Sequence, residues 1–230
     1  IRYIFAVYYG ETCNRQVKYS DNKSVAFDVR LVPDRDYQFV VWADVVAQNG
    51  KVDGVYSNED GLHYNTENLH AITLKDTWVA MDETRDAFTG YYNTEEHDVK
   101  YSGSLPINIT LTRPFAKLRV VTTDMVELGY LGIEPHNAVA TYTTKHYESF
   151  NAYNGSYAGE VSGIEHTYEI ASYGETGANK TIFADYFFAN NEVVKFNLDV
   201  KEANGETIKA NSFSTDIYVR RNYLTTIQGN

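Results

Sequence analysis

Residues 25–46 read VAFDVRLVPDRDYQFVVWADVV and contain the two patterns on which the fold prediction depends. Every second residue from Val25 to Leu31 is apolar, which is typical of a strand with one buried face. Residues 39–46 are apolar almost throughout, which indicates a strand that is covered on both faces. The Pro33-Asp34 pair between the two segments favours a tight turn.

Both patterns recur along the chain. Alternation predicts three more strands, at residues 107–111, 116–120 and 194–200. Residues 1–9 are apolar almost throughout and predict another buried strand. The Asn-Gly pair within residues 201–206 predicts a hairpin, and residues 124–132 predict one short connecting helix. We therefore expect an all-β protein.

Composition agrees with this class and limits the partners. The chain has 230 residues with 20 Tyr and 11 Phe but only 2 Met, and aromatic residues suit half-buried strands. The formal net charge is −11, so the phosphates of nucleic acids and anionic bilayers would be repelled. We expect no nucleic-acid partner, and no apolar run approaches the ~20 residues that span a bilayer.

Two domains fit the length and the order of the segments. Residues 56–103 are polar with weak periodicity and predict long loops with few short strands. Arg113-Pro114 then interrupts a strongly alternating region, and proline breaks ladder pairing. We therefore predict an N-terminal β-sandwich over residues 1–112 and a C-terminal one over residues 113–230.

Catalytic signatures are missing from the sequence. It contains no nucleophile elbow, P-loop, dinucleotide fingerprint or His-Glu-x-x-His motif. Cys13, just past the first strand, is interpreted as an inert packed thiol, and the acidic group Asp82, Glu83 and Asp86 as a solvated loop. No histidine is spaced from another like a helical metal pair, so surface imidazoles explain these residues better. The histidines are His63, His70, His97, His136, His146 and His166. We predict no enzymatic activity, no cofactor and no metal.

Tyrosines are abundant in the predicted loops. Exposed aromatic rings stack on sugars or bind protein partners, but these rings could equally pack the loops onto the sandwich. The residues are Tyr91, Tyr92, Tyr147, Tyr153 and Tyr157. Both interpretations stay open at this point.

Three blocks of sequence resemble the fimbrillin-like proteins of the Bacteroidales. They are FDVRLVPDRDYQFVVWAD at 27–44, RPFAKLRVVTTD at 113–124 and RNYLTTIQGN at 221–230. The resemblance implies two tandem transthyretin-like Greek-key β-sandwich domains. It further implies a lipoprotein precursor that is exported and displayed on the outer membrane or in a fimbrium. Contact with the membrane would be only through the lipid of the precursor.

The resemblance also implies how such subunits join. In that family a protease cuts after an arginine and removes the first strand, and the C-terminal strand of a neighbouring subunit fills the groove. Ile1 would lie shortly after such a cut. The family's chains usually continue past the residues that match Gly229-Asn230, so the donor is expected beyond them. Its partners would be other fimbrial subunits, with host proteins or glycans as further partners.

Two sets of residues are predicted for this joining, and strand pairing with another chain is physically reasonable for an unfilled groove. The acceptor edge is predicted on the first strand, at Arg2, Ile4, Ala6 and Tyr8. The base of the donor strand is predicted at Tyr223, Thr225 and Ile227. The alternative function is a cell-surface lipoprotein module that binds glycans or host proteins and never polymerises.

Overall fold

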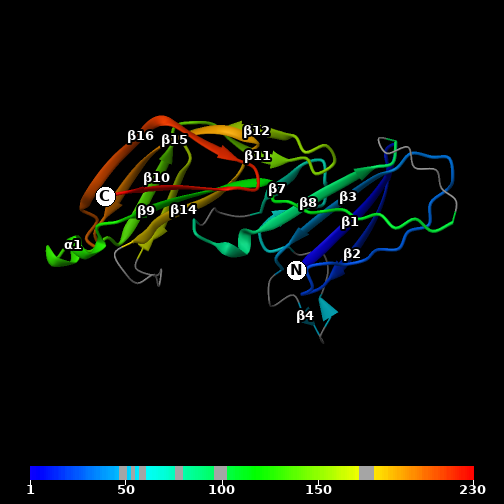
Figure 1. The fold of residues 1–230 in the computed structure, drawn as a ribbon, viewed down its shortest axis with the longest axis horizontal. Helices are drawn as coiled ribbons and strands as arrows, with labels where there is room; N and C mark the ends of the chain where they lie inside the picture. Colours follow the sequence, from blue (N-terminus) through cyan, green and yellow to red (C-terminus); the bar gives the residue numbers. More distant parts are fainter. Residues whose placement is uncertain (47–50, 53–54, 57–60, 76–79, 96–102, 171–178) are drawn as a thin grey trace. The chain divides into compact units, whose positions relative to one another are not determined.

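Strands form almost all of the regular structure, so the predicted all-β class is confirmed. The computed structural model describes residues 1–46, 51–52, 55–56, 61–75, 80–95, 103–170 and 179–230 (Figure 1). Its chain forms two compact units. Unit 1 contains Ile1–Lys75, Thr84–Pro114 and Ser149–Ala158, and unit 2 contains Asp76–Glu83, Phe115–Glu148 and Gly159–Asn230. The predicted domains 1–112 and 113–230 stay a prediction.

Unit 1 is built on one antiparallel sheet with the strand order β2-β1-β3-β8. The strands are β1 (Arg2–Tyr9), β2 (Thr12–Tyr19), β3 (Gln38–Asp44) and β8 (Ala87–Asn93). β1 and β3 confirm the two predicted apolar strands, and both are buried on the two faces of the sheet. The predicted turn at Pro33-Asp34 is also present, and Asp34 has a φ of 57°.

Several short elements lie outside this sheet. They are β4 (Lys51–Val52), β5 (Val55–Tyr56), β6 (Tyr64–Asn65), β7 (Ile72–Leu74) and the 3-10 helix η2 (Glu83–Arg85). β7 pairs with β6 and with the Ser149–Phe150 end of β11 (His146–Phe150). The described parts of residues 56–103 therefore hold more strand than the sequence predicted, because β8 is a full strand of the sheet.

One face of the unit 1 sheet is closed by aromatic packing and a buried ion pair. The Trp42 ring lies 5.2 Å from that of Tyr64 and 6.3 Å from that of Phe150. Beside it, Arg2 Nε and Nη2 donate to the two carboxylate oxygens of Asp44 at 2.9 and 2.6 Å. Both charged side chains are at most 1% exposed.

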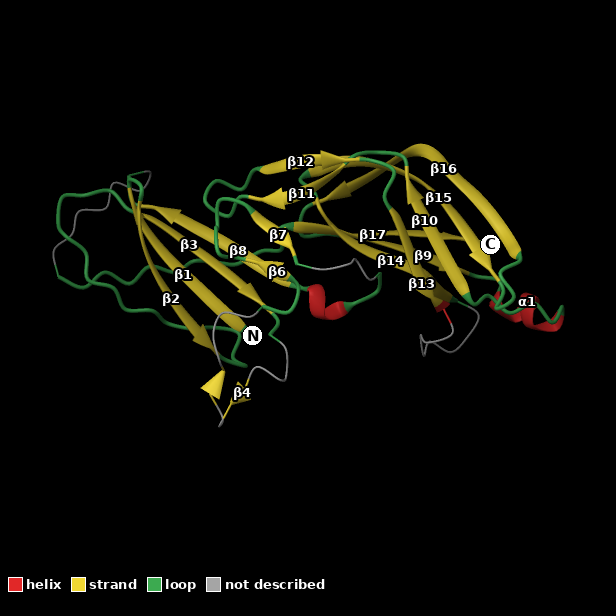
Figure 2. Ribbon diagram, turned by 180° about the vertical axis from the view of Figure 1, so that it is seen from behind, coloured by secondary structure: helices red, strands yellow, loops and turns green. Residues whose placement is uncertain are grey.

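Unit 2 is a sandwich of two layers (Figure 2). One layer has the order β13-β10-β15-β16, and the other contains β17-β9-β14, where β17 runs parallel to β9. Their bounds are β9 (Phe115–Thr122), β10 (Asn137–Tyr142), β12 (Tyr157–Val161), β13 (Glu165–Glu169), β14 (Lys180–Phe188), β15 (Asn191–Lys201), β16 (Thr207–Arg220) and β17 (Leu224–Gly229). β12 pairs with β11.

The core of unit 2 lies between these layers and follows from the alternation in the sequence. Leu118 of β9, Phe183 of β14 and Phe196 of β15 are all at most 1% exposed within one cluster. β9 and β15 confirm two predicted strands, and Glu202 N donates to Glu206 O in the predicted hairpin. The predicted helix is α1 (Met125–Tyr130), and it is followed by Gly132 with a φ of 70°.

Candidate functional site

The second face of the unit 1 sheet is covered by two extended segments, Val25–Leu31 and Ile107–Leu111. Their alternate apolar side chains are partly buried, and they pack on a cluster that includes Phe5 and Phe39. The intervening side chains are exposed, as the sequence predicted. However, neither segment belongs to a β-ladder with any residue that the structure describes, so their prediction as strands was wrong in this respect. We call these two segments the open layer.

Val25–Leu31 lies on the β2 side of the sheet. The Phe27 ring stacks on Phe5 of β1 with centroids 5.0 Å apart. Lys18 Nζ donates a hydrogen bond to Ala26 O at 2.6 Å. Gln16 Nε2 donates another to the carbonyl of Asp28. Side chains of β2 therefore satisfy carbonyls that a neighbouring strand would otherwise bind.

Ile107–Leu111 lies against β8. Thr89 and Thr112 exchange two backbone hydrogen bonds of 2.8 and 2.9 Å, which fix the end of this segment. A Cβ atom at Gly90 would lie 2.8 Å from Ile109 Cγ2 and from Thr110 O. Glycine at this position therefore allows the segment to approach the sheet closely.

Between the two segments of the open layer, the structure describes no strand that pairs with either of them. They lie towards β2 and β8, the two outer strands, while β1 and β3 lie between. Among the described residues, no backbone group from 25 to 31 or from 107 to 111 pairs with another backbone group. Since neighbouring strands lie ~4.8 Å apart, an added extended chain could pair with the backbone of such a segment.

The predicted acceptor edge at Arg2, Ile4, Ala6 and Tyr8 is wrong. β1 is paired along its length with β2 on one side and with β3 on the other. It is an inner strand, so it offers no free edge to another chain. The apolar run that led to this prediction reflects burial on both faces of the sheet.

The predicted donor base lies at the edge of a unit 2 sheet. Of the strands that the structure describes, β17 pairs only with β9, and it places Thr225 opposite Leu118 and Ile227 opposite Val120. Ile227 packs on the unit 2 core, whereas Tyr223 precedes the strand and is 55% exposed. The role of these residues as a donor base stays a prediction.

Two of the predicted surface histidines are buried instead. His146 and His166 are 5% and 7% exposed, and His166 Nδ1 lies 2.5 Å from Asp185 Oδ2. The Tyr142 hydroxyl donates to the same oxygen at 2.7 Å, and burial raises the pKa of Tyr142. Burial lowers the pKa of His146 to about 4, so this imidazole is neutral at physiological pH. His97 lies outside the described residues.

The acidic residues Glu83 and Asp86 each form an ion pair with a different basic side chain. Lys117 pairs with Glu83, and Arg113 forms a bidentate pair with Asp86 at 2.5 and 2.6 Å. Within the described ranges, no three His, Cys, Asp or Glu side chains are grouped so that they could hold a metal ion. In the same ranges no helix has the length and apolar character needed to cross a membrane.

Cys13 and most of the tyrosines singled out from the sequence lie on or near unit 1. Cys13 is exposed on β2, so its interpretation as a packed thiol is wrong. Tyr153 stacks on His70 with ring centroids 4.7 Å apart, and Tyr157 donates a hydrogen bond to Pro114 O. Tyr91, by contrast, is 49% exposed. Packing therefore explains part of this group.

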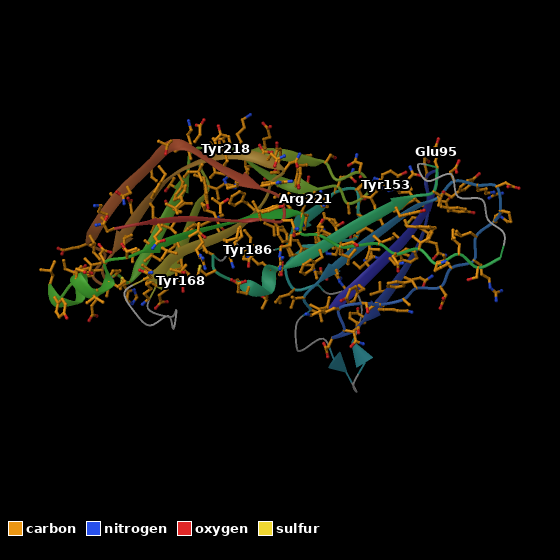
Figure 3. All side chains as sticks on the ribbon, viewed as in Figure 1. Glu95, Tyr153, Tyr168, Tyr186, Tyr218 and Arg221 are labelled. Atoms are coloured by element: carbon orange, nitrogen blue, oxygen red, sulfur yellow. The ribbon has the colours of Figure 1, made fainter. Side chains whose placement is uncertain are left out.

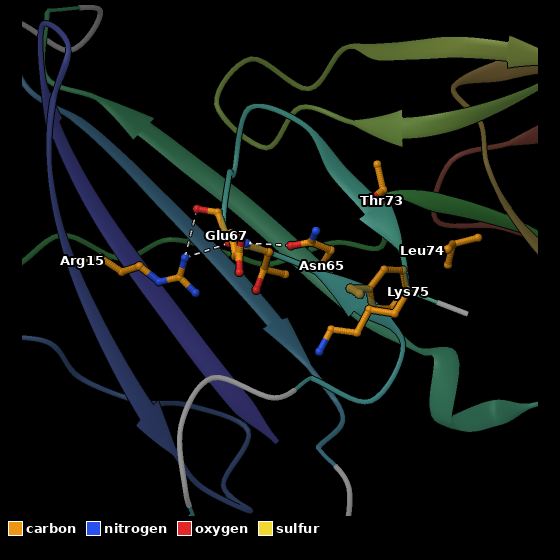
Figure 4. A pocket seen from close by; sticks show the side chains of 8 residues that line it. Arg15, Asn65, Glu67, Thr73, Leu74 and Lys75 are labelled. Atoms are coloured by element: carbon orange, nitrogen blue, oxygen red, sulfur yellow. Dashed lines mark hydrogen bonds between the residues drawn. The ribbon is translucent and has the colours of Figure 1, made fainter. Parts of the chain in front are cut away.

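A polar cavity of ≈ 340 Å³ lies beside β6 and β7 (Figure 4). Its lining residues are Arg15, Tyr64, Asn65, Thr66, Glu67, Thr73, Leu74 and Lys75. Arg15 Nη1 donates to Thr66 O at 2.7 Å, and Asn65 Oδ1 accepts from Glu67 N. These bonds hold the loop around β6, and the lining contains no histidine or cysteine that could act as a nucleophile or base.

One protein family model matches residues 1–230, and its description is "Family of unknown function (DUF6562)". No curated protein matches the chain. Among solved structures, a candidate cell adhesion protein from Bacteroides ovatus is similar, with a TM-score of 0.51 and 13% identity. The match covers 98% of this chain and 81% of that one. Another, from Bacteroides eggerthii, has a TM-score of 0.49 and 13% identity over 100% of this chain and 79% of that one. At this identity the likeness to the Bacteroides ovatus structure shows the fold.

Proposed function

The chain belongs to the DUF6562 family, and we propose that it is a structural subunit of a cell-surface fimbria. In this proposal the open layer of unit 1 accepts a strand from another copy of the chain. Assembly is then β-augmentation between subunits and requires no catalytic group or cofactor. The resemblance to fimbrillin-like proteins suggests this mode of joining.

The observation that carries the proposal is the pattern of the open layer. Val25–Leu31 and Ile107–Leu111 have the apolar alternation of strands and bury the expected side chains. Each nevertheless lacks a ladder partner within the described chain. Unpaired strand backbone beside an apolar surface favours pairing with another chain. A missing strand explains both the sequence pattern and the absent pairing.

The free energy available from such an insertion is large. A donor of about seven residues, roughly the length of the first segment, would form on the order of ten ladder hydrogen bonds at a net ~0.5–1.5 kcal/mol each. Its inward side chains would cover apolar surface at about 25 cal/mol per Å². The joint would therefore dissociate very slowly.

We place the base of the donor at Tyr223, Thr225 and Ile227, with the donor itself C-terminal to β17 in the full-length protein. The edge position of β17 supports this assignment, because a chain that leaves an edge strand is free to extend. The candidate cell adhesion protein from Bacteroides ovatus has a similar fold, which agrees with export to the cell surface.

The experiment is to express the full-length precursor, cleave it with an arginine-specific protease and run the product on detergent gels. We expect a ladder of subunits that withstands detergent and collapses on boiling. Val29→Asp places a charge on the inward face of the open layer and should abolish the ladder. Arg30→Asp, on the exposed face of the same segment, is the matched control and should leave the ladder intact.

A cleaved wild-type protein that stays monomeric contradicts the proposal. That result would favour the second candidate function, a surface module that binds glycans or host proteins. Exposed tyrosines on unit 2 favour this candidate, since Tyr218 is 72% exposed on β16 (Figure 3). The Arg220 guanidinium lies 4.7 Å from the centre of the Tyr223 ring nearby. Glycan-array binding that is lost in Tyr218→Ser would support it.

A further inference from the structure

We propose that assembled copies also meet through two exposed apolar patches, one on each unit. The tip patch consists of Val126, Tyr130 and Leu131 in and after α1. The rim patch consists of Tyr9, Val32 and Leu105 at one end of the open layer. The tip of one copy would dock on the rim of the next. This inference rests on the proposed function and adds a second contact to the strand joint.

The tip patch is unusual for a short connecting helix. None of the residues of α1 is buried, and the exposed fractions are 44% for Val126, 86% for Tyr130 and 72% for Leu131. Large contiguous patches of exposed apolar side chains are rare on monomers and mark interaction sites. α1 therefore makes its apolar residues available to a partner.

The tip patch lies where β17 ends. Gly229, the last residue of β17, pairs with Thr122, and its carbonyl accepts a hydrogen bond from Thr123 N at 2.9 Å. α1 begins two residues after Thr123. A donor that continues from β17 therefore leaves unit 2 beside the tip patch.

The rim patch lies at the end of the unit 1 sheet where β1 ends. The Tyr9 ring lies 5.7 Å from that of Tyr37, and the Tyr37 hydroxyl accepts a hydrogen bond from Val32 N at 3.0 Å. Tyr9 and Val32 are 45% and 50% exposed. Both therefore border the same end of the open layer.

Leu105 belongs to this end as well. The antiparallel bridge between Thr89 and Thr112 directs the chain from Thr112 back towards Asn93, the last residue of β8. Asn93 pairs with Gln38, and Gln38 pairs with Tyr8 beside Tyr9. Leu105 precedes the segment at this end and is 49% exposed.

Each patch binds the other patch on a second copy of this chain. In this proposal the donor enters the open layer from the rim end, and it therefore brings unit 2 of its own copy, with the tip patch, to that rim. Because the two patches differ, the contact is heterologous and can repeat from copy to copy without closing. The apolar contact would restrict hinge motion about a joint that otherwise consists of one strand.

The test uses the cleaved full-length protein and single charges placed in the patches. Leu131→Asp and Val32→Asp should each reduce the yield of multimers about tenfold at fixed protein concentration. Ser162→Asp on unit 2 and Ser24→Asp at the opposite end of the open layer are exposed matched controls and should leave the yield unchanged. Since all four positions are exposed, thermal melting should not change, which separates joining from folding.

A double variant that places opposite charges in the two patches provides the decisive test. Leu105→Lys combined with Leu131→Asp should restore most of the yield, because opposite charges then meet at each joint. Multimer yields equal to those of Ser162→Asp and Ser24→Asp would overturn the tip-and-rim contact while leaving strand exchange standing. Absence of multimers from the wild-type protein would overturn the proposed function and this contact together.

Discussion

Arg2 and Asp44 are the most buried ion pair described in unit 1, and neither side chain reaches solvent appreciably. Thr66 Oγ1 accepts a further bond from Arg2 Nη2, and Trp42 Nε1 donates to Asp44 Oδ2 at 3.1 Å. Two buried charges that satisfy each other are tolerated, whereas one buried charge alone is not. Replacement of either residue alone would therefore leave one charge buried without its partner.

We expect Asp44→Asn to lower the free energy of unfolding by about 3–5 kcal/mol, because it leaves the Arg2 charge unpaired in the core. Urea denaturation followed by tryptophan fluorescence measures this. Lys145→Ala breaks an exposed pair with Glu160 and should leave the same quantity almost unchanged, because solvent screens exposed ion pairs. The double variant Arg2→Met with Asp44→Leu should recover most of the loss. Equal losses in the single and double variants would contradict this account.

His146 makes unit 2 sensitive to acid. Its neighbours are the ring of Tyr142 at 4.3 Å, the ring of Phe187 at 4.7 Å, and the ionisable side chains of Asp185 and His166. Burial lowers its pKa from 6.5 to about 4, so the unfolded state binds a proton more tightly than the folded state. The stability due to neutral His146 is complete above pH 6.5 and is lost as the pH falls towards 4.

The expected loss is about 3 kcal/mol between pH 6.5 and pH 4, from the factor of 1.36 kcal/mol per pKa unit. Unfolding free energies of the wild type and of His146→Phe, measured by denaturation across this range, give the contribution of His146 as a difference. The variant should depend less on pH. Parallel curves for the two proteins would show that His146 does not titrate in this way.

At the scale of elements, the open layer has the alternating side chains of a strand but lacks, among the described residues, the backbone hydrogen bonds that usually accompany them. Alternation in Val25–Leu31 and Ile107–Leu111 specifies which side chains face the sheet, and the structure places them so. Hydrogen bonding requires a neighbour of matching register, and the described chain supplies none to these segments. β9, with the same alternation, has β14 and β17 as neighbours and forms a full ladder.

Hydrogen exchange should therefore distinguish free and assembled protein. In the cleaved, monomeric protein, amides of residues 25–31 should exchange at least ~100-fold faster than those of β1, because they lack backbone acceptors. In detergent-resistant multimers the amides that face the inserted strand should become protected, while those of β1 stay as they are. Mass spectrometry of peptides from the two states measures this. Equal protection of residues 25–31 in both states would rule out insertion beside this segment.

At the scale of the whole molecule, the two units are not simple consecutive halves of the chain. Ser149–Ala158 belongs to unit 1 although it comes late in the sequence. Phe150 packs on Trp42, and Ala152 N donates to Leu69 O at 2.8 Å. In return, residues near Met81 belong to unit 2, where Met81 N donates to Ala184 O.

A fragment of residues 1–112 should consequently fold poorly, because it lacks the segment that covers Trp42. We expect it to melt at least ~10 °C lower than the full chain or to be insoluble, since loss of a buried Phe costs about 3–5 kcal/mol. Thermal melting followed by circular dichroism tests this. Adding residues 149–158 through a flexible linker should restore stability. A fragment 1–112 that melts like the full chain would show that the predicted domain is autonomous.

The sequence alone determined the all-β class, the buried strands β1 and β3, the core strands β9 and β15, and the facing of each side chain in the open layer. These features depend on local periodicity, which a single chain segment carries by itself. Only the tertiary structure decided that β1 is an inner strand, that His146 and His166 are buried around Asp185, and that Val25–Leu31 has no ladder partner among the described residues. Pairing and burial of polar groups depend on which distant segments meet, and no local pattern encodes the identity of a neighbour.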